Sequence, residues 1–235
     1  MTVEREQLEA DVLIVGAGPA GLGCALHLAN LIKKHNQSGA GPPLSAENIY
    51  VLEKGREIGA QQLSGAIMNP KALAELVPDF QTSAPLDTPV TDSAALFFTQ
   101  GSSFRFPITP PPFQNRGNYV VSLNKIVKWL GGLVESAGVN VFKEFGGAEL
   151  VYQNGAVAGV ITEDKGLDKD GRPKDNYTPG YELRAKVTVL AEGTRGSLTK
   201  KLVAEKKLDN LNPQSYGIGI KELWEVQPVA RRPAM

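Results

Sequence analysis

The feature that most constrains the fold of this chain is an apolar run that passes directly into closely spaced glycines. Val12 to Val15 are consecutive apolar residues, a pattern typical of a buried parallel strand. Gly16, Gly18 and Gly21 follow with the spacing G-x-G-x-x-G, and residues 22–32 continue in a helical pattern. The first glycine permits a tight turn, the second lets the backbone approach a pyrophosphate, and the third lets the helix pack closely on the strand. This order predicts a dinucleotide site with its phosphates at the helix N-terminus.

A second predicted strand, residues 48–53, ends in the acid that would complete this site. The carboxylate of Glu53 can accept hydrogen bonds from the ribose hydroxyls of an adenosine. Glu53 lies 32 residues after Gly21, whereas about 20 is usual; the loop-like composition of residues 37–46 accounts for the excess as a surface insertion. The charge disfavours NADP, because it would repel the 2′-phosphate. The alternative is a solvated glutamate at the end of a strand.

A third informative stretch lies late in the chain, where residues 186–190 predict another buried strand. This strand continues into Ala-Glu-Gly, and Gly193 together with Gly196 allows a sharp turn into a short helix over residues 197–203. The start of that helix would meet the same cofactor a second time. An ordinary strand-turn-helix corner is the alternative.

The remaining patterns predict short strands and two further helices. Two hairpins are indicated, one by residues 95–99 and 104–106, the other by residues 150–152 and 156–162 around Gln153-Asn154-Gly155. Other predicted elements are a short helix over residues 70–77, strands over residues 119–121 and 139–142, and a helix from Ser122 to about Val134. Residues 78–91, 107–117 and 164–180 have the composition of loops. We expect residues 1–10 to be a tail, residues 11–225 to form one domain with a β insertion at about 95–162, and residues 226–235 to be a second tail.

Composition excludes several classes of function. The chain has 25 lysines and arginines against 25 aspartates and glutamates, so no bulk charge draws it to nucleic acid. Cys24 is the only cysteine, which excludes an internal disulfide and an all-cysteine metal or iron–sulfur site within these residues. Asp168-Lys169-Asp170-Gly171 resembles the start of a calcium loop, but the required glutamate falls on Pro179, so we expect an exposed turn and no metal. No apolar run reaches transmembrane length, and the polar N-terminus does not resemble a targeting peptide.

Several blocks of the sequence together resemble one family of flavoproteins. The glycine turn, the second strand with its terminal acid and the late Ala-Glu-Gly turn resemble the FAD-binding domain of glutathione-reductase-type enzymes. More specific blocks are similar to the electron-transfer flavoprotein–ubiquinone oxidoreductases; they are residues 53–54, 58–66, 84–91, 117–121, 185–188 and 216–224. The resemblance runs from about Asp11 to Trp224, nearly the whole chain.

The resemblance implies a fold, a cofactor and a route for electrons. The fold would be α/β, a Rossmann-like FAD/NAD(P)-binding domain with a parallel sheet plus a smaller antiparallel β layer from the hairpins between residues 95 and 162. Members of this family carry FAD and a 4Fe-4S cluster, take electrons from reduced electron-transfer flavoprotein and pass them to ubiquinone from one membrane leaflet. Because FAD accepts and releases electrons singly, the protein positions and tunes it, and we expect no catalytic side chain. The polar N-terminus favours the cytoplasmic side of a bacterial inner membrane; eukaryotic relatives would lie on the mitochondrial inner membrane.

The same resemblance assigns roles to individual residues. The pyrophosphate would be held by Gly16, Gly18, Pro19, Ala20 and Gly21, and the ribose by Glu53. Along the cofactor would lie Lys54, Ser64 and Gly65, and its other side would be closed by Ala191, Glu192 and Gly193. Residues 58–79 match a membrane-associated segment that borders the quinone route, and they hold enough apolar side chains for shallow insertion. Packing of this segment on the domain's own core is the alternative.

Departures from the family leave other functions open. Members are more than twice as long and carry their cluster cysteines near the C-terminus. We therefore expect a truncated N-terminal portion without the cluster and without most of the quinone region. One alternative is an NAD(P)H-dependent reductase or hydroxylase of the same fold. Another is a non-catalytic fragment, such as a nucleotide-binding remnant without electron transfer.

Overall fold

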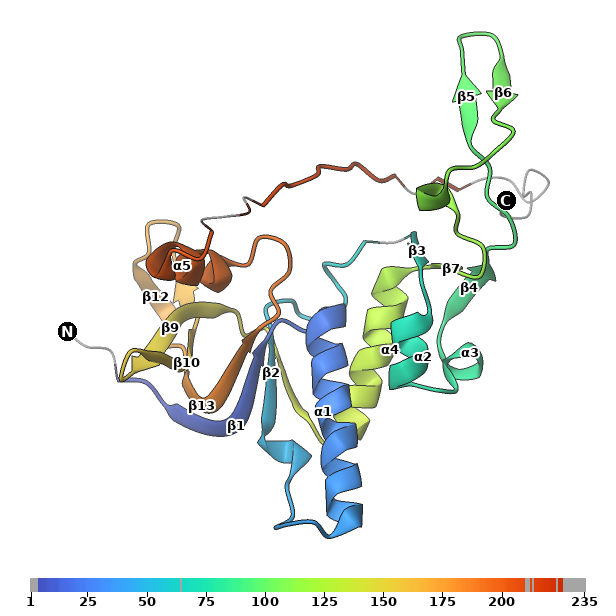
Figure 1. Ribbon diagram of the computed structural model, residues 1–235. Helices are drawn as coiled ribbons and strands as arrows, with labels where there is room; N and C mark the ends of the chain where they lie inside the picture. Colours follow the sequence, from blue (N-terminus) through green and yellow to red (C-terminus); the bar gives the residue numbers. More distant parts are fainter. Residues whose placement is uncertain (1–3, 64, 210–211, 213, 223, 226–235) are drawn as a thin grey trace. The chain divides into compact units, whose positions relative to one another are not determined.

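The computed structural model describes residues 4–63, 65–209, 212, 214–222, 224 and 225, and the tail expected over residues 226–235 lies outside them (Figure 1). The chain divides into two units, one made of residues 1–61 and 127–217 and the other of residues 62–126 and 218–235. The first unit contains the glycine-rich turn; residues 62–126 of the second unit are inserted into it in the sequence, and residues 218–235 follow it. Among the described helices, none is long and apolar enough to cross a membrane.

The first unit is built on a six-stranded sheet in the order β8-β2-β1-β13-β10-β9. Its strands are β1 (Gln7–Val15), β2 (Ile49–Glu53), β8 (Asn140–Lys143), β9 (Gly147–Gln153), β10 (Ala156–Thr162) and β13 (Glu182–Leu190). The first three and β13 are parallel where they pair, as β8-β2-β1-β13. This parallel core confirms the predicted α/β class. β1 begins before the apolar run, inside the expected tail, because Gln7 already pairs with Glu182 of β13.

The core of this unit lies where the central strands meet α5 (Ser197–Lys206). One buried cluster, with every member at most 4% exposed, consists of Leu13, Val15, Leu52, Val160, Leu183 and Leu198. Aromatic rings continue this core in edge-to-face contacts, with successive centroids 5.1, 6.1 and 5.7 Å apart along Tyr50, Phe142, Phe145 and Tyr181. Leu13, Ile14 and Val15 of the apolar run that predicted β1 are therefore buried, as expected for a central parallel strand.

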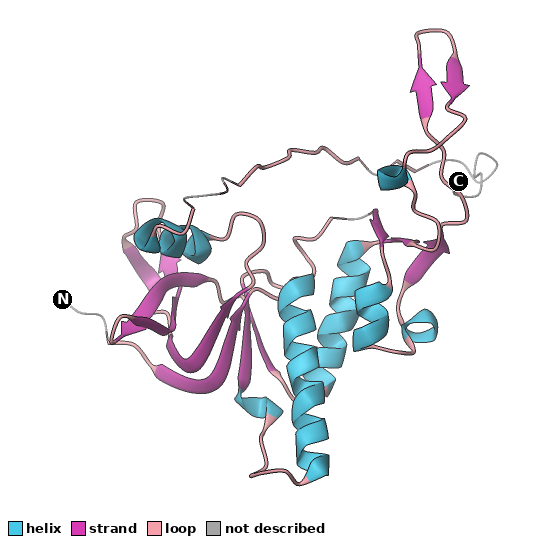
Figure 2. Cartoon of the chain, in the orientation of Figure 1, coloured by secondary structure: helices cyan, strands magenta, loops and turns pink. Residues whose placement is uncertain are grey.

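Helix α1 (Pro19–Ser38) follows β1 and is longer than the predicted residues 22–32. Figure 2 shows it running alongside the parallel strands. The helix ends at Gly39, whose φ of +64° is common just beyond a helix C-terminus. Its last turns hold the surface insertion in place, because the Asn36 side chain accepts a hydrogen bond from the Leu44 amide (2.9 Å) and donates one to the Leu44 carbonyl (2.8 Å). A 3-10 turn, Ala46–Asn48, then leads into β2.

Helix α4 (Leu123–Ser136) confirms the amphipathic helix predicted after Ser122. Its apolar positions Ile126, Val127, Leu130 and Val134 are all buried. The helix leads into β8, as the sequence predicted. The first of its two glycines is needed for packing, because an added Cβ at Gly131 would lie 2.7 Å from the Ile58 side chain.

The β9–β10 hairpin has the turn that the sequence predicted, but it belongs to a different sheet from the one expected. Asn154 and Gly155 have φ values of +51° and +79°, the paired positive angles of a two-residue hairpin turn. We expected the hairpins between residues 95 and 162 to form a separate antiparallel layer. β10 instead pairs with β13, so this hairpin extends the main sheet. Gly159 permits that pairing, because an added Cβ would overlap the Leu183 carbonyl oxygen.

The second unit consists of small antiparallel sheets and short helices. A three-stranded sheet in the order β3-β7-β4 contains β3 (Ala66–Met68), β7 (Tyr119–Val121) and β4 (Leu86–Pro89). A separate hairpin pairs β5 (Leu96–Phe98) with β6 (Ser103–Arg105), as predicted. The helical turns are α2 (Lys71–Leu76), α3 (Phe80–Ser83) and a 3-10 turn at Pro111–Phe113. The prediction of a loop over residues 78–91 is corrected by α3 and β4, since β4 forms only by pairing with the distant β7.

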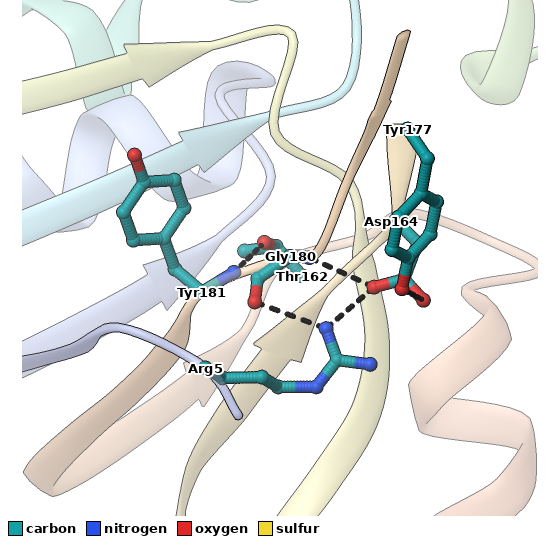
Figure 3. A network of polar contacts seen from close by, with 6 residues as sticks. All are labelled: Arg5, Thr162, Asp164, Tyr177, Gly180 and Tyr181. Carbon is teal, nitrogen blue, oxygen red and sulfur yellow. Dashed lines mark hydrogen bonds and ion pairs between the residues drawn. The ribbon is translucent and has the colours of Figure 1, made fainter. Parts of the chain in front are cut away.

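A polar network fixes the β11–β12 hairpin of the first unit, formed by β11 (Lys165–Leu167) and β12 (Pro173–Thr178) (Figure 3). The Asp164 carboxylate accepts hydrogen bonds from the Arg5 guanidinium (2.5 Å), the Gly180 amide (2.8 Å) and the Tyr177 hydroxyl (3.1 Å). The guanidinium also donates to the Gly180 carbonyl (3.0 Å). These contacts, the one from Arg5 above all, lower the pKa of the Asp164 carboxyl to about 2. The network therefore ties the N-terminal segment to the hairpin.

Asp164 should make the stability of the first unit depend on pH in the acid range. Because its pKa is lower in the folded than in the unfolded chain, its contribution is complete above the ordinary value of 3.8 and disappears as the pH falls through about 2. We expect Asp164→Asn to lower the free energy of unfolding by about 1 kcal/mol at neutral pH, allowing for solvent screening of this partly exposed group. Urea unfolding at stepwise lower pH should show the difference from wild type shrinking towards about pH 2. Asp170→Asn, in the exposed turn of the same hairpin, is the control and should have little effect; a difference for Asp164→Asn that did not change with pH would contradict the assignment.

Candidate dinucleotide-binding site

The ends of three parallel strands meet at one edge of the main sheet. Val15 at the end of β1 lies opposite Leu52 of β2 and Leu190 of β13. The residues that follow these three are Gly16, Glu53 and Ala191. Backbone hydrogen bonds join the segments, from the Gly16 amide to the Leu52 carbonyl (2.9 Å) and from the Ala191 amide to the Val15 carbonyl (2.8 Å). Three stretches identified separately in the sequence therefore meet at the carboxyl edge of the sheet, where α/β folds bind ligands.

The glycine turn is so closely packed that two of its glycines have no room for a side chain. Gly16 has a φ of +109°, and an added Cβ would lie 2.5 Å from the Ala191 carbonyl oxygen. At Gly21 an added Cβ would overlap the carbonyl oxygen of Gly16. The first turn of α1 therefore rests directly on the end of β1, which is the packing that the glycine spacing predicts.

The N-terminus of α1 is open to an anion. Gly18 is the N-cap residue, and within the described part of the chain no side-chain hydrogen bond caps the helix. The first turn contains no acidic residue, and both Pro19 and Ala20 are exposed. Backbone N–H groups at a helix N-terminus lack partners within the helix and carry a partial positive charge. The uncapped start of this 20-residue helix is therefore suited to bind phosphate.

The Glu53 carboxylate joins the glycine turn to the loop after β2. Its Oε2 accepts a hydrogen bond from the Ala17 amide (3.2 Å), and its Oε1 accepts one from the Gly55 amide (2.7 Å). Each carboxylate oxygen can accept more than one hydrogen bond, so capacity remains for ribose hydroxyls. Sequence reasoning missed Ala17 and Gly55, because a backbone amide that donates a hydrogen bond leaves no signal in residue type.

The Glu192 carboxylate occupies the N-terminus of α5. It accepts hydrogen bonds from the Leu198 amide (3.2 Å), the Thr199 amide and hydroxyl (both 2.8 Å) and the Ser197 hydroxyl (3.3 Å). Burial raises the pKa of this carboxyl, but the hydrogen bonds outweigh burial and hold its pKa below the ordinary value. Gly196 leaves the room that this requires, since an added Cβ would lie 2.5 Å from Glu192. The two helix starts near this edge therefore differ: α1 is open, whereas α5 already holds a carboxylate.

The remaining residues that the sequence assigned to the cofactor site lie in several parts of the structure. Gly193 has a φ of +83° and is exposed after β13, and Lys54 is exposed after β2. Gly65 is exposed in the second unit, and Ser64 lies outside the described residues. The structure thus brings together the glycine turn, Glu53 and the Ala-Glu-Gly turn. The hydrogen bonds to Thr199 were missed, because a helix cap from a residue several positions upstream has no fixed sequence pattern.

The chain is similar over its length to proteins named electron transfer flavoprotein-ubiquinone oxidoreductase. It is 45% identical to the probable enzyme of Acinetobacter baylyi, over 100% of this chain and 41% of that protein. It is 47% identical to the mitochondrial protein of Dictyostelium discoideum, over 95% of this chain and 36% of that protein. For the mitochondrial protein of Bos taurus the identity is 42%, over 99% of this chain and 37% of that protein. The chain therefore spans about two fifths of the length of these relatives, and no family model matches it.

Solved structures with the same fold include flavin enzymes. The structure is similar to a geranylgeranyl bacteriochlorophyll reductase-like protein from Thermoplasma acidophilum, with a TM-score of 0.53 and 22% identity over 83% of this chain and 42% of that one. It is also similar to a flavin-dependent monooxygenase solved with FAD and substrate, with a TM-score of 0.55 and 17% identity over 85% of this chain and 32% of that one. At these identities the likeness establishes the Rossmann-like fold alone.

Proposed function

Because the chain is 42–47% identical to proteins named electron transfer flavoprotein-ubiquinone oxidoreductase, we propose that it belongs with them, binds FAD and contributes to electron transfer from reduced electron-transfer flavoprotein to ubiquinone. The donor and the acceptor are those in the names of its relatives. We assign FAD binding to the residues described here, and the complete reaction to a protein of the relatives' full length.

The observation that supports FAD binding is the open N-terminus of α1 beside a carboxylate at the same sheet edge. The backbone N–H groups of Gly18, Ala20 and Gly21 at the start of α1 would hold the pyrophosphate, which needs partial positive charge. Glu53 would accept hydrogen bonds from the ribose hydroxyls while remaining bonded to the glycine turn. Ala191 would border the site through its backbone, which already lies against Gly16. These residues fit the charge pattern of FAD, an anionic centre beside neutral hydroxyl donors.

The chain's own residues would position this cofactor and would not act as acid or base. When bound, FAD supplies one-electron transfer. The two carboxylates at the turn are engaged, Glu53 by backbone amides and Glu192 by the start of α5. A 4Fe-4S cluster would need ligands from outside this sequence, because Cys24 is its only cysteine. We place the protein at the surface of a membrane, the cytoplasmic side of an inner membrane in a bacterium, because ubiquinone is dissolved in the bilayer.

Titration of the chain with FAD tests the proposal first. We expect saturable quenching of flavin fluorescence with one FAD per chain. The loaded chain is then mixed without oxygen with reduced electron-transfer flavoprotein or with NADPH, and the visible flavin absorbance is followed. We expect bleaching by the flavoprotein and none by NADPH. Bleaching by NADPH would instead favour a reductase or hydroxylase of this fold, and failure to retain FAD would favour a non-catalytic fragment.

A further inference from the structure

The region around α5 concentrates positive charge in a chain that is neutral overall. The whole chain has 25 lysines and arginines against 25 acids, but residues 193–209 contain five basic residues against two acids. Four of these basic residues form what we call the α5 basic cluster, and all four are exposed: Arg195, Lys200, Lys201 and Lys207. A local excess of one charge on a neutral protein indicates a surface that recognises the opposite charge.

The cluster lies along the outer side of a helix whose inner side is fixed. Leu198 is fully buried in the core of the first unit, and Leu202 and Val203 are half-buried. Figure 1 shows α5 on the outside of the sheet, next to β9. The exposed positions of the helix recur at intervals of three and four residues, which places them on one face; they are Ser197, Lys200, Lys201 and Ala204. The lysines are therefore presented on a supported element.

The charges of the cluster are not neutralised within the part of the chain that the structure describes. No carboxylate there lies within ion-pair distance of any of the four side chains. The one acid on the helix, Glu205, is already engaged, because it accepts a hydrogen bond from the Tyr152 hydroxyl (2.7 Å) and pairs with Lys206 (3.3 Å). Lys201 donates to a neutral group, the Ala148 carbonyl (2.8 Å). The four positive charges thus remain available to a partner.

Helix stability does not account for the charges at the start of α5. Cations are favourable near a helix C-terminus and unfavourable near its N-terminus. Lys207, at the C-terminal end, follows this rule. Arg195 precedes the N-cap residue Gly196, and Lys200 and Lys201 are the fourth and fifth residues of the helix, so these three oppose it. Residues that break a local stability rule are expected at functional sites.

The composition of this face favours an acidic protein surface over the other anionic partners. A helix that lies in a lipid surface presents large apolar side chains on one face, whereas the apolar side chains of α5 pack inwards and its exposed face offers only Ala204. Lysines and arginines are almost never buried unless paired, so cover by another part of a longer chain would need an acid for each of them. Charged, exposed surfaces of this kind are typical of transient contacts between proteins, including electron-transfer pairs.

The cluster is joined directly to the proposed cofactor site. Ala191 lies with its backbone against Gly16 of the glycine turn. The next residue, Glu192, accepts hydrogen bonds from the Leu198 and Thr199 amides at the start of α5 (3.2 and 2.8 Å). The basic cluster begins three residues later, at Arg195, whose guanidinium is held over the Tyr216 ring (5.5 Å to its centroid). A protein docked on α5 would therefore contact the element that closes one side of this site.

We propose that the α5 basic cluster is the docking surface for the protein that supplies electrons, and that it binds an acidic surface of that donor. The inference rests on the proposed function, which identifies the donor as reduced electron-transfer flavoprotein. Carboxylates of the donor pair with the four basic side chains, and the field of the cluster speeds association in a way that salt suppresses.

Binding of fluorescently labelled electron-transfer flavoprotein to the 235-residue chain, followed by anisotropy, tests this inference. Affinity is measured at about 10 mM and about 150 mM salt, between which the screening length falls from about 30 to about 8 Å. We expect tighter binding at low salt. The double substitution Lys200→Glu/Lys207→Glu should weaken low-salt binding by about tenfold or more and remove most of the salt dependence.

Lys33→Glu/Lys34→Glu is the matched control. Both lysines are exposed near the end of α1, and the double substitution changes the net charge by the same amount. It should change affinity for the flavoprotein by less than about twofold. FAD titration of each variant reports folding and the α1 site, since none of the four lysines is assigned to cofactor binding.

Three outcomes would overturn the inference. They are absence of flavoprotein binding at low salt, unchanged binding in Lys200→Glu/Lys207→Glu, and an equal loss in the control, which would reflect net charge alone. Phosphatidylglycerol vesicles are tested in parallel, and a loss of vesicle binding in the α5 variant with unchanged flavoprotein binding would assign the cluster to lipid instead. Salt-dependent flavoprotein binding by a chain that does not retain FAD would support the docking surface and count against the proposed function alone.

Discussion

Substitution of Gly21 by alanine is expected to weaken FAD binding strongly and to destabilise the first unit. The added Cβ would overlap the Gly16 carbonyl oxygen. Gly16 cannot move away easily, because its amide is bonded to Leu52 (2.9 Å) and its backbone lies against Ala191. Such overpacking lowers the free energy of unfolding by about 1–3 kcal/mol or more. The displaced start of α1 would also move the amides that we propose hold the pyrophosphate, so FAD affinity should fall by at least about 100-fold.

Gly23 provides the matched control on the same helix. Nothing lies within 4 Å of a Cβ added there, and the backbone is helical. Gly23→Ala should therefore raise the free energy of unfolding by about 0.5–1 kcal/mol through helix propensity and leave FAD affinity unchanged. Urea unfolding and quenching of flavin fluorescence are measured for both variants. Wild-type FAD affinity in a folded Gly21→Ala variant would show that the phosphates bind elsewhere.

Replacement of Glu53 by glutamine is expected to weaken FAD binding by about 10- to 100-fold, with a smaller loss of stability. Both carboxylate oxygens accept hydrogen bonds from backbone amides, those of Ala17 and Gly55. A glutamine must turn its own N–H donors towards one of these amides, and an unsatisfied donor costs about 1–3 kcal/mol. The substitution also removes an acceptor that we propose for the ribose hydroxyls. FAD titration measures the affinity, and urea unfolding of the apoprotein measures the stability.

Glu57→Gln is the control for the loss of charge. Glu57 lies four residues later and forms an ion pair with Lys128 (2.9 Å) in which both side chains are about two-thirds exposed. Its replacement should change the free energy of unfolding by less than about 0.5 kcal/mol and leave FAD affinity unaltered. Displacement of FAD by ADP is then compared with displacement by ADP that carries a 2′-phosphate. The Glu53 charge should disfavour the 2′-phosphate, so only Glu53→Gln should reduce this discrimination. Unchanged FAD affinity in Glu53→Gln would contradict the ribose assignment.

Elements with a strong local signal were predicted close to their observed bounds. The Asn154-Gly155 turn forms as expected because few residues other than glycine and asparagine adopt two successive positive φ angles. The amphipathic pattern after Ser122 predicted α4 because helical spacing of apolar residues is itself the signal for a buried helix face. By contrast, β4 and the first half of β1 were missed, because both depend on partner strands that are distant in the sequence.

By itself, the sequence determined the glycine turn, the parallel strands that flank it and the resemblance of the chain to one family of flavoproteins. These depend on local sterics and on residue spacing, which are present in the sequence before folding. Only the tertiary structure decided that the Glu53 carboxylate bonds Ala17 and Gly55, and that Glu192 fills the start of α5. Only the tertiary structure also decided that Leu73 is buried while Phe98 is exposed. Hydrogen-bond partners and burial depend on which distant segments come together, and composition alone does not specify those contacts.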